Sequence, residues 1–397
     1  MKKILVLFYL LSPISLLCME GAHPLDEMIL KTNQDPYAKY PTLRTEITSV
    51  TETVGTYTKY LEKQLDSSNG LESAQEKFNE QYTERLKELL EWQKDPLFNT
   101  TFLKDFDGTQ KHLLDNEGFK AVSFTTEDGV NLAGLCKLRE KAKFNIIVSN
   151  GFTPGKKEGM ATLLKLFPNS CNMLLFDARS HGESEGNLWR DVLWSKYHGR
   201  DEYKDIWAAV EHMNTKAPNA RNILYGTCEG AFHSANAILE AQSQGCLDEL
   251  NIEALIFDSG WDKFVEAGYS VAKQNLTGCY RPLYYGASLL YQTWLKGYDP
   301  LISGYRSIQE TRDLPHRMSN FPNSIKTVFI HGVEDRDVPI ENIRTLHGNR
   351  PQGTSVMYES SVPNPHALMQ VKDKLRYALW MRKELEALEL IRKFQQL

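Results

Sequence analysis

The segment Gly226-Thr227-Cys228-Glu229-Gly230 constrains the fold of this chain more than any other. It lies between an apolar, strand-like run at residues 222–225 and a helix-like run of small residues at 231–241. A cysteine flanked by glycines at such a junction is typical of a nucleophile elbow, because glycine lets the chain turn tightly around an exposed nucleophile. The dipole of the following helix also favours the thiolate form of the cysteine. By itself the pattern is also that of a cysteine packed at the end of a strand, so its context decides the interpretation.

Apolar, strand-like runs and helical patterns alternate from about residue 118 onward. The runs at 121–126 and 131–135 flank Glu127-Asp128-Gly129 and predict a β-hairpin. Further strands are predicted at 144–149, 172–177, 222–225, 254–258, 327–331 and 355–358, and helices at 160–167, 202–216, 230–244 and 367–395. This alternation predicts a mostly parallel sheet that is covered by helices on both faces.

Five short motifs follow one another in an order that resembles the α/β-hydrolase superfamily over about residues 118–385. They are an oxyanion-type loop at Ser149-Asn150-Gly151-Phe152, an Asp-x-Arg-x-x-Gly-x-Ser-like run at 177–184, the elbow around Cys228, an acidic loop at 331–339, and Pro365-His366-Ala367 after the last strand. The chain order of nucleophile, acid and base is the order that this fold uses. The resemblance implies an α/β-hydrolase-like domain at residues 118–397.

The resemblance also implies a catalytic triad of Cys228, Asp335 and His366. His366 would hold the sulfur of Cys228 as a thiolate and then protonate the leaving group, and Asp335 would orient the imidazole ring. The backbone N–H groups of Phe152 and Glu229 would form the oxyanion hole. These groups lie far apart in the sequence, so only the fold can bring them together.

Other carboxylates compete with Asp335 for the role of the acid. Asp337 and Glu334 share its loop, and the register from Gly332 favours Asp335. We expect Asp337 to cap the turn that follows. Asp258 is a further alternative, since it ends an earlier strand at which some relatives in the family carry the acid.

Other histidines compete with His366 for the role of the base. The main competitor is His347, but it precedes the last predicted strand, whereas His366 follows it. His331 and His181 are expected to make structural hydrogen bonds at a strand end and in a loop. His233 lies shortly after the nucleophile and is expected to pack within its helix.

Three residues depart from the usual pattern of the superfamily. Cys228 stands where most members carry serine, and the dienelactone hydrolase type is the minority that uses cysteine. Glu229 places a carboxylate beside the sulfur, which opposes thiolate formation unless that carboxylate points to solvent or pairs with a base. Asn150 replaces a frequent histidine. Three functions therefore stay open: a hydrolase of an ester, thioester or amide acting through an acyl-cysteine, a thiol acyltransferase or thioesterase, and a catalytically weak or inactive binding protein.

The first 117 residues predict a leader and a helical extension. Met1-Lys2-Lys3 and the apolar run at 4–17 are typical of a signal peptide, and the run is short for a bilayer span. Residues 1–19 therefore predict export to the periplasm or medium, with an uncleaved membrane anchor as the alternative. Within residues 20–117, apolar stripes at 43–61 and 71–89 predict a helical hairpin, which either packs on the main domain or holds a protein partner.

Composition argues against several other classes of protein. The net charge of −5 comes without a basic stripe, so no nucleic-acid partner is expected. The cysteines and histidines lack the spacing of a zinc site, so we expect no metal and no cofactor. Without Cys18, the odd number of cysteines allows two disulfides and one free thiol in an exported protein.

A tyrosine-rich segment at about residues 262–325 interrupts the alternation of strands and helices. Ligands of such sheets bind at the carboxyl ends of the strands. An insertion at this place predicts a lid over a small-molecule acyl substrate. Its aromatic side chains favour an apolar or aryl acyl group, although aromatic residues are also ordinary packing material.

Overall fold

The protein is described here from a computed structural model. The described residues are 105–152, 155–167, 171–187, 191, 199–264, 313–362, 366–367, 369–372, 377–378, 380–385 and 387–388. They belong to one compact unit, Asn99–Leu397. The predicted leader and N-terminal hairpin lie outside the described residues, as does the predicted lid between residues 265 and 312.

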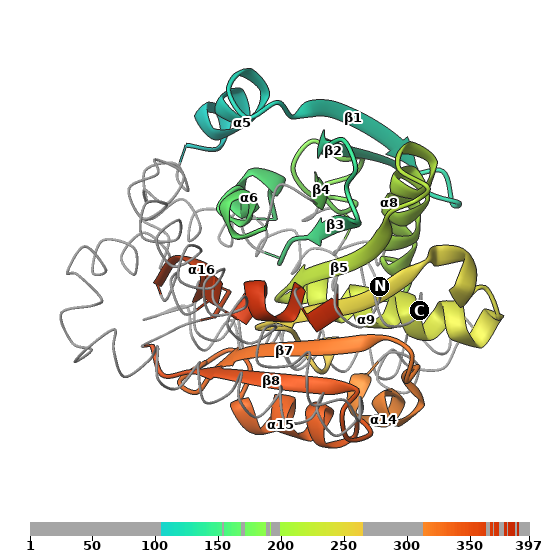
Figure 1. The fold of residues 1–397 in the computed structure, drawn as a ribbon, viewed down its shortest axis with the longest axis vertical. Helices are drawn as coiled ribbons and strands as arrows, with labels where there is room; N and C mark the ends of the chain where they lie inside the picture. Colours follow the sequence, from blue (N-terminus) through green and yellow to red (C-terminus); the bar gives the residue numbers. More distant parts are fainter. Residues whose placement is uncertain are drawn as a thin grey trace, which may run out of the picture. The chain divides into compact units, whose positions relative to one another are not determined.

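An eight-stranded sheet forms the centre of this unit (Figure 1). Its strands are β1 (Lys120–Thr125), β2 (Asn131–Lys137), β3 (Phe144–Ser149), β4 (Cys171–Phe176), β5 (Arg221–Thr227), β6 (Ile252–Asp258), β7 (Lys326–Gly332) and β8 (Ser355–Ser360). They lie in the order β1-β2-β4-β3-β5-β6-β7-β8, and β2 runs antiparallel to both of its neighbours. The other adjacent strands are parallel. The predicted hairpin and the predicted mostly parallel, α/β-hydrolase-like sheet are confirmed.

The described helical segments connect these strands. They are α5 (Phe106–Asp115), η2 (Lys157–Met160), α6 (Leu163–Leu166), α8 (Tyr203–Lys216), α9 (Glu229–Gln244), η3 (Leu247–Leu250), α14 (Leu314–Arg317), η5 (Met318–Asn320), α15 (Ile340–Gly348) and α16 (Met369–Lys372). The helix predicted at 160–167 is present only in part: the single α-turn of α6 lies within this range, and the 3-10 turn of η2 ends at Met160. Phe167 is extended, with ψ of 139°, as expected for a residue before proline, and this ends α6.

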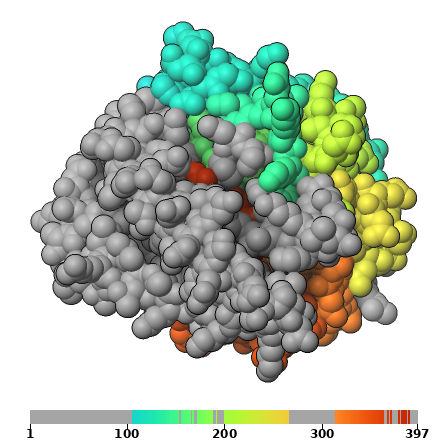
Figure 2. Space-filling view, in the orientation of Figure 1, coloured from blue at the N-terminus to red at the C-terminus, as the bar shows by residue number. Residues whose placement is uncertain are grey.

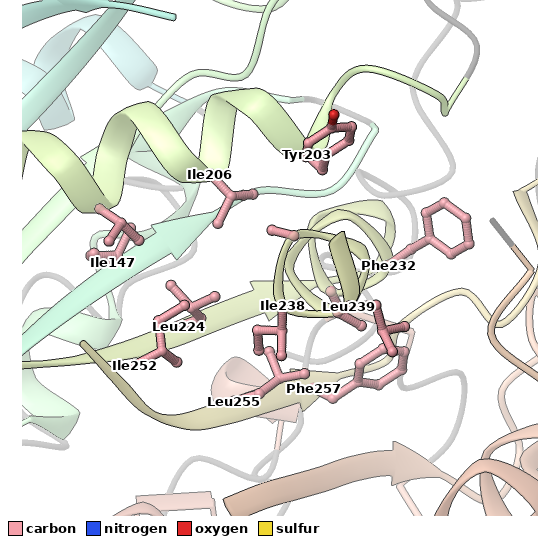
Figure 3. Packing of buried hydrophobic residues seen from close by; sticks show 14 of the residues in the cluster. Ile147, Tyr203, Ile206, Leu224, Phe232, Ile238, Leu239, Ile252, Leu255 and Phe257 are labelled. Carbon is pink, nitrogen blue, oxygen red and sulfur yellow. The ribbon is translucent and has the colours of Figure 1, made fainter. Parts of the chain in front are cut away.

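Different helices cover the two faces of the sheet, because successive side chains of a strand point to opposite faces. On one face, Leu224 of β5 packs with Ile238 of α9 (Figure 3). On the other face, the ring of Tyr225 meets Phe167 edge-on at 6.2 Å, and its hydroxyl is hydrogen-bonded to that of Tyr377. All six residues of β3 and of β4 are buried, as a sheet covered on both sides requires.

The two edges of the sheet lie at opposite ends of the described surface. Residues of α5 and β1 form the cyan region of Figure 2, and the orange atoms of residues 313–362 lie at the far end in the same view. Of the predicted lid, residues 262–264 and 313–325 are described. Their side chains Leu314, Met318 and Phe321 are buried in the same core cluster as α9.

Two further findings concern the described residues alone. None of their helices combines the length and the hydrophobicity that crossing a membrane requires. The four cysteines within these ranges, Cys136, Cys171, Cys228 and Cys246, are free thiols. The two disulfides that export would allow are therefore not formed among them.

Candidate active site

Cys228 occupies a sharp turn between β5 and α9. Its φ of 54° and ψ of −122° lie in a region that residues with a side chain seldom adopt. Backbone hydrogen bonds hold this conformation: the N–H of Cys228 donates to the carbonyl of Asp258 at 2.9 Å, and its own carbonyl accepts from Trp261 at 3.2 Å. The turn is thus fastened to the end of β6, which is the geometry expected of a nucleophile elbow.

The two glycines of the motif are required by close backbone contacts. A methyl group on Gly226 would lie 2.4 Å from the Cα atom of Ala231. A methyl group on Gly230 would lie 2.4 Å from the carbonyl oxygen of Ser149. The elbow therefore packs directly against both its own helix and the end of β3, where the predicted oxyanion loop begins.

The structure brings the three predicted triad residues into one hydrogen-bonded chain. The Nε2 atom of His366 lies 3.1 Å from the Sγ atom of Cys228, and its Nδ1 atom lies 2.8 Å from Oδ2 of Asp335. The other oxygen of Asp335 accepts the backbone N–H groups of Asp337 and Val338 at 2.8 and 3.0 Å. Hydrogen bonds therefore fix the orientation of both oxygens of the Asp335 carboxylate.

The charges of the three hydrogen-bonded residues, Cys228, His366 and Asp335, stabilise one another. Burial lowers the pKa of His366, but the charges of Asp335 and Cys228 and the bonds to both outweigh burial and leave the pKa well above its ordinary value. Burial raises the pKa of Asp335, but the positive charge on His366 outweighs it and leaves this pKa below its usual range. The arrangement thus favours an imidazolium between a carboxylate and a sulfur that can become a thiolate.

The alternative acids do not take the position of Asp335. The nearest oxygen of Asp337 lies 4.0 Å from Nδ1 of His366, and Glu334 is exposed. The prediction that Asp337 caps the following turn is wrong, because α15 begins at Ile340 after Pro339 and no side chain caps it. Asp258 instead accepts hydrogen bonds from Tyr225 and Tyr377 at 2.7 and 2.6 Å below the elbow.

The other histidines make structural contacts. His347 bonds to Ser355 at 2.8 Å. Nε2 of His331 donates to the carbonyl of Val338 at 2.9 Å, which braces the turn that carries Asp335. The ring nitrogens of His181 lie 3.0 and 3.2 Å from two backbone carbonyl oxygens, those of Arg179 and Phe152. The structural hydrogen bonds predicted for His331 and His181 are confirmed.

The two predicted oxyanion-hole residues lie next to the nucleophile in the chain, in the case of Glu229, and next to a glycine in contact with it, in the case of Phe152. Glu229 is the first residue of α9, where backbone N–H groups have no partner within the helix. Phe152 follows Gly151, whose backbone is in contact with the side chain of Cys228. The ring of Phe152 packs near Trp261 and against His181, with centroid distances of 6.2 and 5.9 Å. Their role as oxyanion donors stays a prediction.

The side chain of Glu229 does not point to solvent. It is buried, and its Oε1 atom lies 3.3 Å from Nε2 of His233, one helical turn further on. Sequence reasoning expected His233 to pack within its helix, which is confirmed, but it missed this ion pair. The i, i+4 spacing of the two residues was the available signal.

A buried lysine that sequence reasoning also missed anchors the segment after Phe152. The ammonium group of Lys157 lies 2.9 Å from Asp177, 2.7 Å from Glu183 and 2.9 Å from Glu158. Its backbone N–H donates to Asp177 as well, at 2.6 Å. These contacts join the start of η2 to the loop after β4, so the oxyanion loop is held at its far end.

One group in the site has the composition of a metal-ligand set. Ligand atoms of Asp335, Asp337 and His366 lie within 4.8 Å of one another. Both oxygens of Asp335 and Nδ1 of His366 are, however, already joined in hydrogen bonds. The carboxylate is thus placed to orient the imidazole of His366, and a metal ion would have to displace the Asp335–His366 bond.

Comparisons with known proteins found similarity among solved structures only. No protein-family model matches the chain, and no curated protein matches it. An esterase from Pyrococcus furiosus has 21% identity and a TM-score of 0.48, over 68% of this chain and 91% of that one. The 2,6-dihydroxy-pseudo-oxynicotine hydrolase has 14% identity and a TM-score of 0.48, over 69% and 70%. A proline iminopeptidase from Mycobacterium smegmatis has 12% identity and the same TM-score, over 69% and 100%.

The fold of the described residues follows from the chain's own strand order, its reversed second strand and the sharp turn between β5 and α9. On these features, strands β1 to β8 form a sheet of the α/β-hydrolase kind.

Proposed function

We propose that this protein is a thiol hydrolase that cleaves an ester, thioester or amide through a covalent acyl intermediate on Cys228. The observation that carries the proposal is the chain of contacts from sulfur to imidazole to carboxylate, 3.1 Å and 2.8 Å long. A nucleophile within hydrogen-bonding reach of a base, with that base oriented by a third group, is the arrangement that covalent catalysis requires.

Acylation starts from the Cys228 thiolate and the His366 imidazolium. The sulfur attacks the carbonyl carbon of the substrate, and the electron pair of the C=O bond moves to the oxygen. The N–H groups of Glu229 and Phe152 would stabilise the resulting oxyanion. When the C=O bond forms again, the bond to the leaving group breaks, and Nε2 of His366 gives its proton to that group.

Deacylation repeats the same steps with water as the nucleophile. Neutral His366 takes a proton from water at Nε2 while the water oxygen attacks the thioester carbon. Collapse of the second oxyanion breaks the C–S bond, releases the carboxylic acid and returns the thiolate beside the imidazolium. Asp335 stays ionised throughout and stabilises the positive charge on the ring.

The test uses p-nitrophenyl acetate and related activated esters with three proteins: the wild type, Cys228→Ala and Cys246→Ala. Cys246 is a partly exposed free thiol away from the triad, so its variant controls for non-specific thiol reactivity. We expect the first variant to lose turnover by about 10³-fold or more and the second to keep it. Mass spectrometry of the intact protein should trap one acetyl group, located on Cys228.

Other outcomes distinguish the remaining functions. Equal rates for wild type and Cys228→Ala, or the absence of an acyl adduct with every activated ester, would end the hydrolase proposal and favour a binding protein. An adduct that is stable in water but is consumed when an amine or alcohol is added would identify an acyltransferase instead.

A further inference from the structure

A glutamate follows the nucleophile directly in the chain, where its charge should hinder catalysis. Glu229 is only 1% exposed, so water does little to screen its carboxylate. A negative charge on the residue next to the sulfur disfavours the thiolate on which the proposed function depends. Something in the structure has to compensate for it.

His233 is in the position to do so. It lies one turn along α9, and its Nε2 atom is 3.3 Å from Oε1 of Glu229, with both side chains no more than 4% exposed. The rings of Phe232 and Phe264 pack against the imidazole, with centroids 5.5 and 6.1 Å away. Two aromatic rings therefore pack against the imidazole, and because both partners are buried, an unpaired charge on either of them is costly.

The charges around His233 favour its protonated form. Burial lowers the pKa of His233, but Glu229, together with Glu202 and Asp205 of the neighbouring α8 segment, outweighs burial and leaves the pKa above its ordinary value. Asp205 has its own partner, because Arg179 donates to it at 2.8 Å through both a side-chain and a backbone N–H. Glu229 and His233 therefore form a pair of opposite charges, and Glu202 adds a further negative charge that favours the imidazolium.

We propose that His233 is a positioning residue for the nucleophile: it pairs with the Glu229 carboxylate one turn along α9, so that this charge does not oppose formation of the Cys228 thiolate. This inference rests on the proposed function and names a residue outside the triad on which it depends. A pair that served stability alone would leave the ionisation of Cys228 unchanged, so the two roles are separable.

The experiment follows the alkylation of Cys228 by iodoacetamide against pH in the full-length protein, with the modified residue located by peptide mass spectrometry. Three variants complete a cycle with the wild type: His233→Gln, Glu229→Gln and the double variant. Only His233→Gln leaves an unpaired carboxylate. We expect it to raise the pH midpoint of alkylation by about one to two units, as Coulomb's law predicts for an unpaired charge on the residue next to the sulfur at an effective dielectric of about 20.

The other two variants should keep the midpoint of the wild type to within roughly a third of a unit, because the carboxylate is gone. An unchanged midpoint in H233Q, or an equal shift in the double variant, would overturn the proposal. If His233→Gln does not fold, the variant Glu229→Asp replaces it in the test. The shorter side chain withdraws the carboxylate from the imidazole of His233, while the carboxylate and the imidazole are both retained. It should raise the midpoint by a smaller amount, and no rise would count against the proposal.

Alkylation needs no turnover, so this test is independent of the hydrolase assay. If the wild-type midpoint equals that of free cysteine, near pH 8.5, the proposed function itself fails. If the wild-type midpoint is low and H233Q leaves it low, only the role of His233 fails.

Discussion

Gly151 and Cys228 lie so close together that no side chain fits between them. A methyl group on Gly151 would lie 2.7 Å from the Cβ atom and 3.2 Å from the Sγ atom of Cys228. The backbone of the loop that follows β3 thus reaches the candidate nucleophile, although 77 residues separate the two positions (228 − 151 = 77). Any group added at residue 151 must displace either the loop or the sulfur.

Gly151→Ala should therefore impair catalysis without unfolding the protein. We expect kcat/KM for an activated ester to fall about 10- to 100-fold, because a shift of the loop misplaces an oxyanion donor. Gly159→Ala is the matched control, since a methyl group there meets only Phe106, at 3.8 Å. Equal activity of the two variants, measured with circular dichroism to check folding, would mean that the loop does not form the oxyanion hole.

Asp335 and Asp337 allow a sharp test of which carboxylate orients the base. Asp335→Asn should lower kcat by about 10²- to 10⁴-fold, because the amide no longer stabilises the imidazolium and changes which ring nitrogen carries a proton. Asp337→Asn should change kcat by less than about threefold, since its carboxylate is 4.0 Å from Nδ1 and accepts no bond from it. The reverse order of effects in steady-state kinetics would assign the acid to Asp337.

Removing the base should return Cys228 to the behaviour of an ordinary thiol. In His366→Gln the sulfur loses its imidazolium partner, so the pH midpoint of its alkylation should move to about 8.5 or above. His347→Gln alters a histidine that bonds to Ser355 and should leave the alkylation curve in place. Superimposable curves for wild type and His366→Gln would show that no base is engaged with the sulfur.

Lys157 should matter for stability far more than an exposed lysine with an equally short ion pair. Lys157 is fully buried among three carboxylates, so Lys157→Met leaves them without their cation and should cost about 3–5 kcal/mol of unfolding free energy in urea. Lys111→Met removes a pair with Asp115 whose side chains are 78% and 53% exposed, and should leave the urea midpoint in place. A midpoint shift of the same size in both variants would contradict this contrast.

The stability that Asp128 provides should depend on pH in the acid range. Burial raises its pKa, but Arg179, Thr126 and Lys204 outweigh burial and lower the pKa to about 2. A lowered pKa means that the contribution is complete above the unfolded value, about 3.9, and is lost as the pH falls through about 2.

The variant Asp128→Asn measures this contribution. The wild type should exceed it by at most about 1 kcal/mol at pH 6, since the carboxylate is partly exposed and its pair with Arg179 is screened by water. The difference should shrink towards zero as the pH is lowered from 4 to 2. A difference that grows on acidification would reverse the sign of this linkage.

Local patterns were sufficient for the strands. Phe144 to Ser149 is a short, largely apolar run between polar residues, and β3 has these bounds. The helix predicted at 160–167 was too long, because apolar spacing does not mark where a helix begins and ends. The residues between the extended Lys156 and Phe167 divide into the 3-10 turn η2 and the single α-turn α6.

The identity of the acid needed the fold. Glu334, Asp335 and Asp337 are all carboxylates in one loop, and sequence register could only favour one of them. The turn decides between them, because the N–H groups of Asp337 and Val338 hold one oxygen of Asp335 and direct the other towards His366.

The amino-acid sequence by itself determined the succession of strands, the elbow and the order of sulfur, carboxylate and imidazole along the chain, because these depend on local periodicity and on glycine at tight turns. The tertiary structure alone decided that the three groups meet, that Glu229 is buried against His233, and that Lys157 anchors the loop after Phe152. Those outcomes depend on burial and on charges contributed by distant segments, and neither quantity exists until the sheet and its helices have packed.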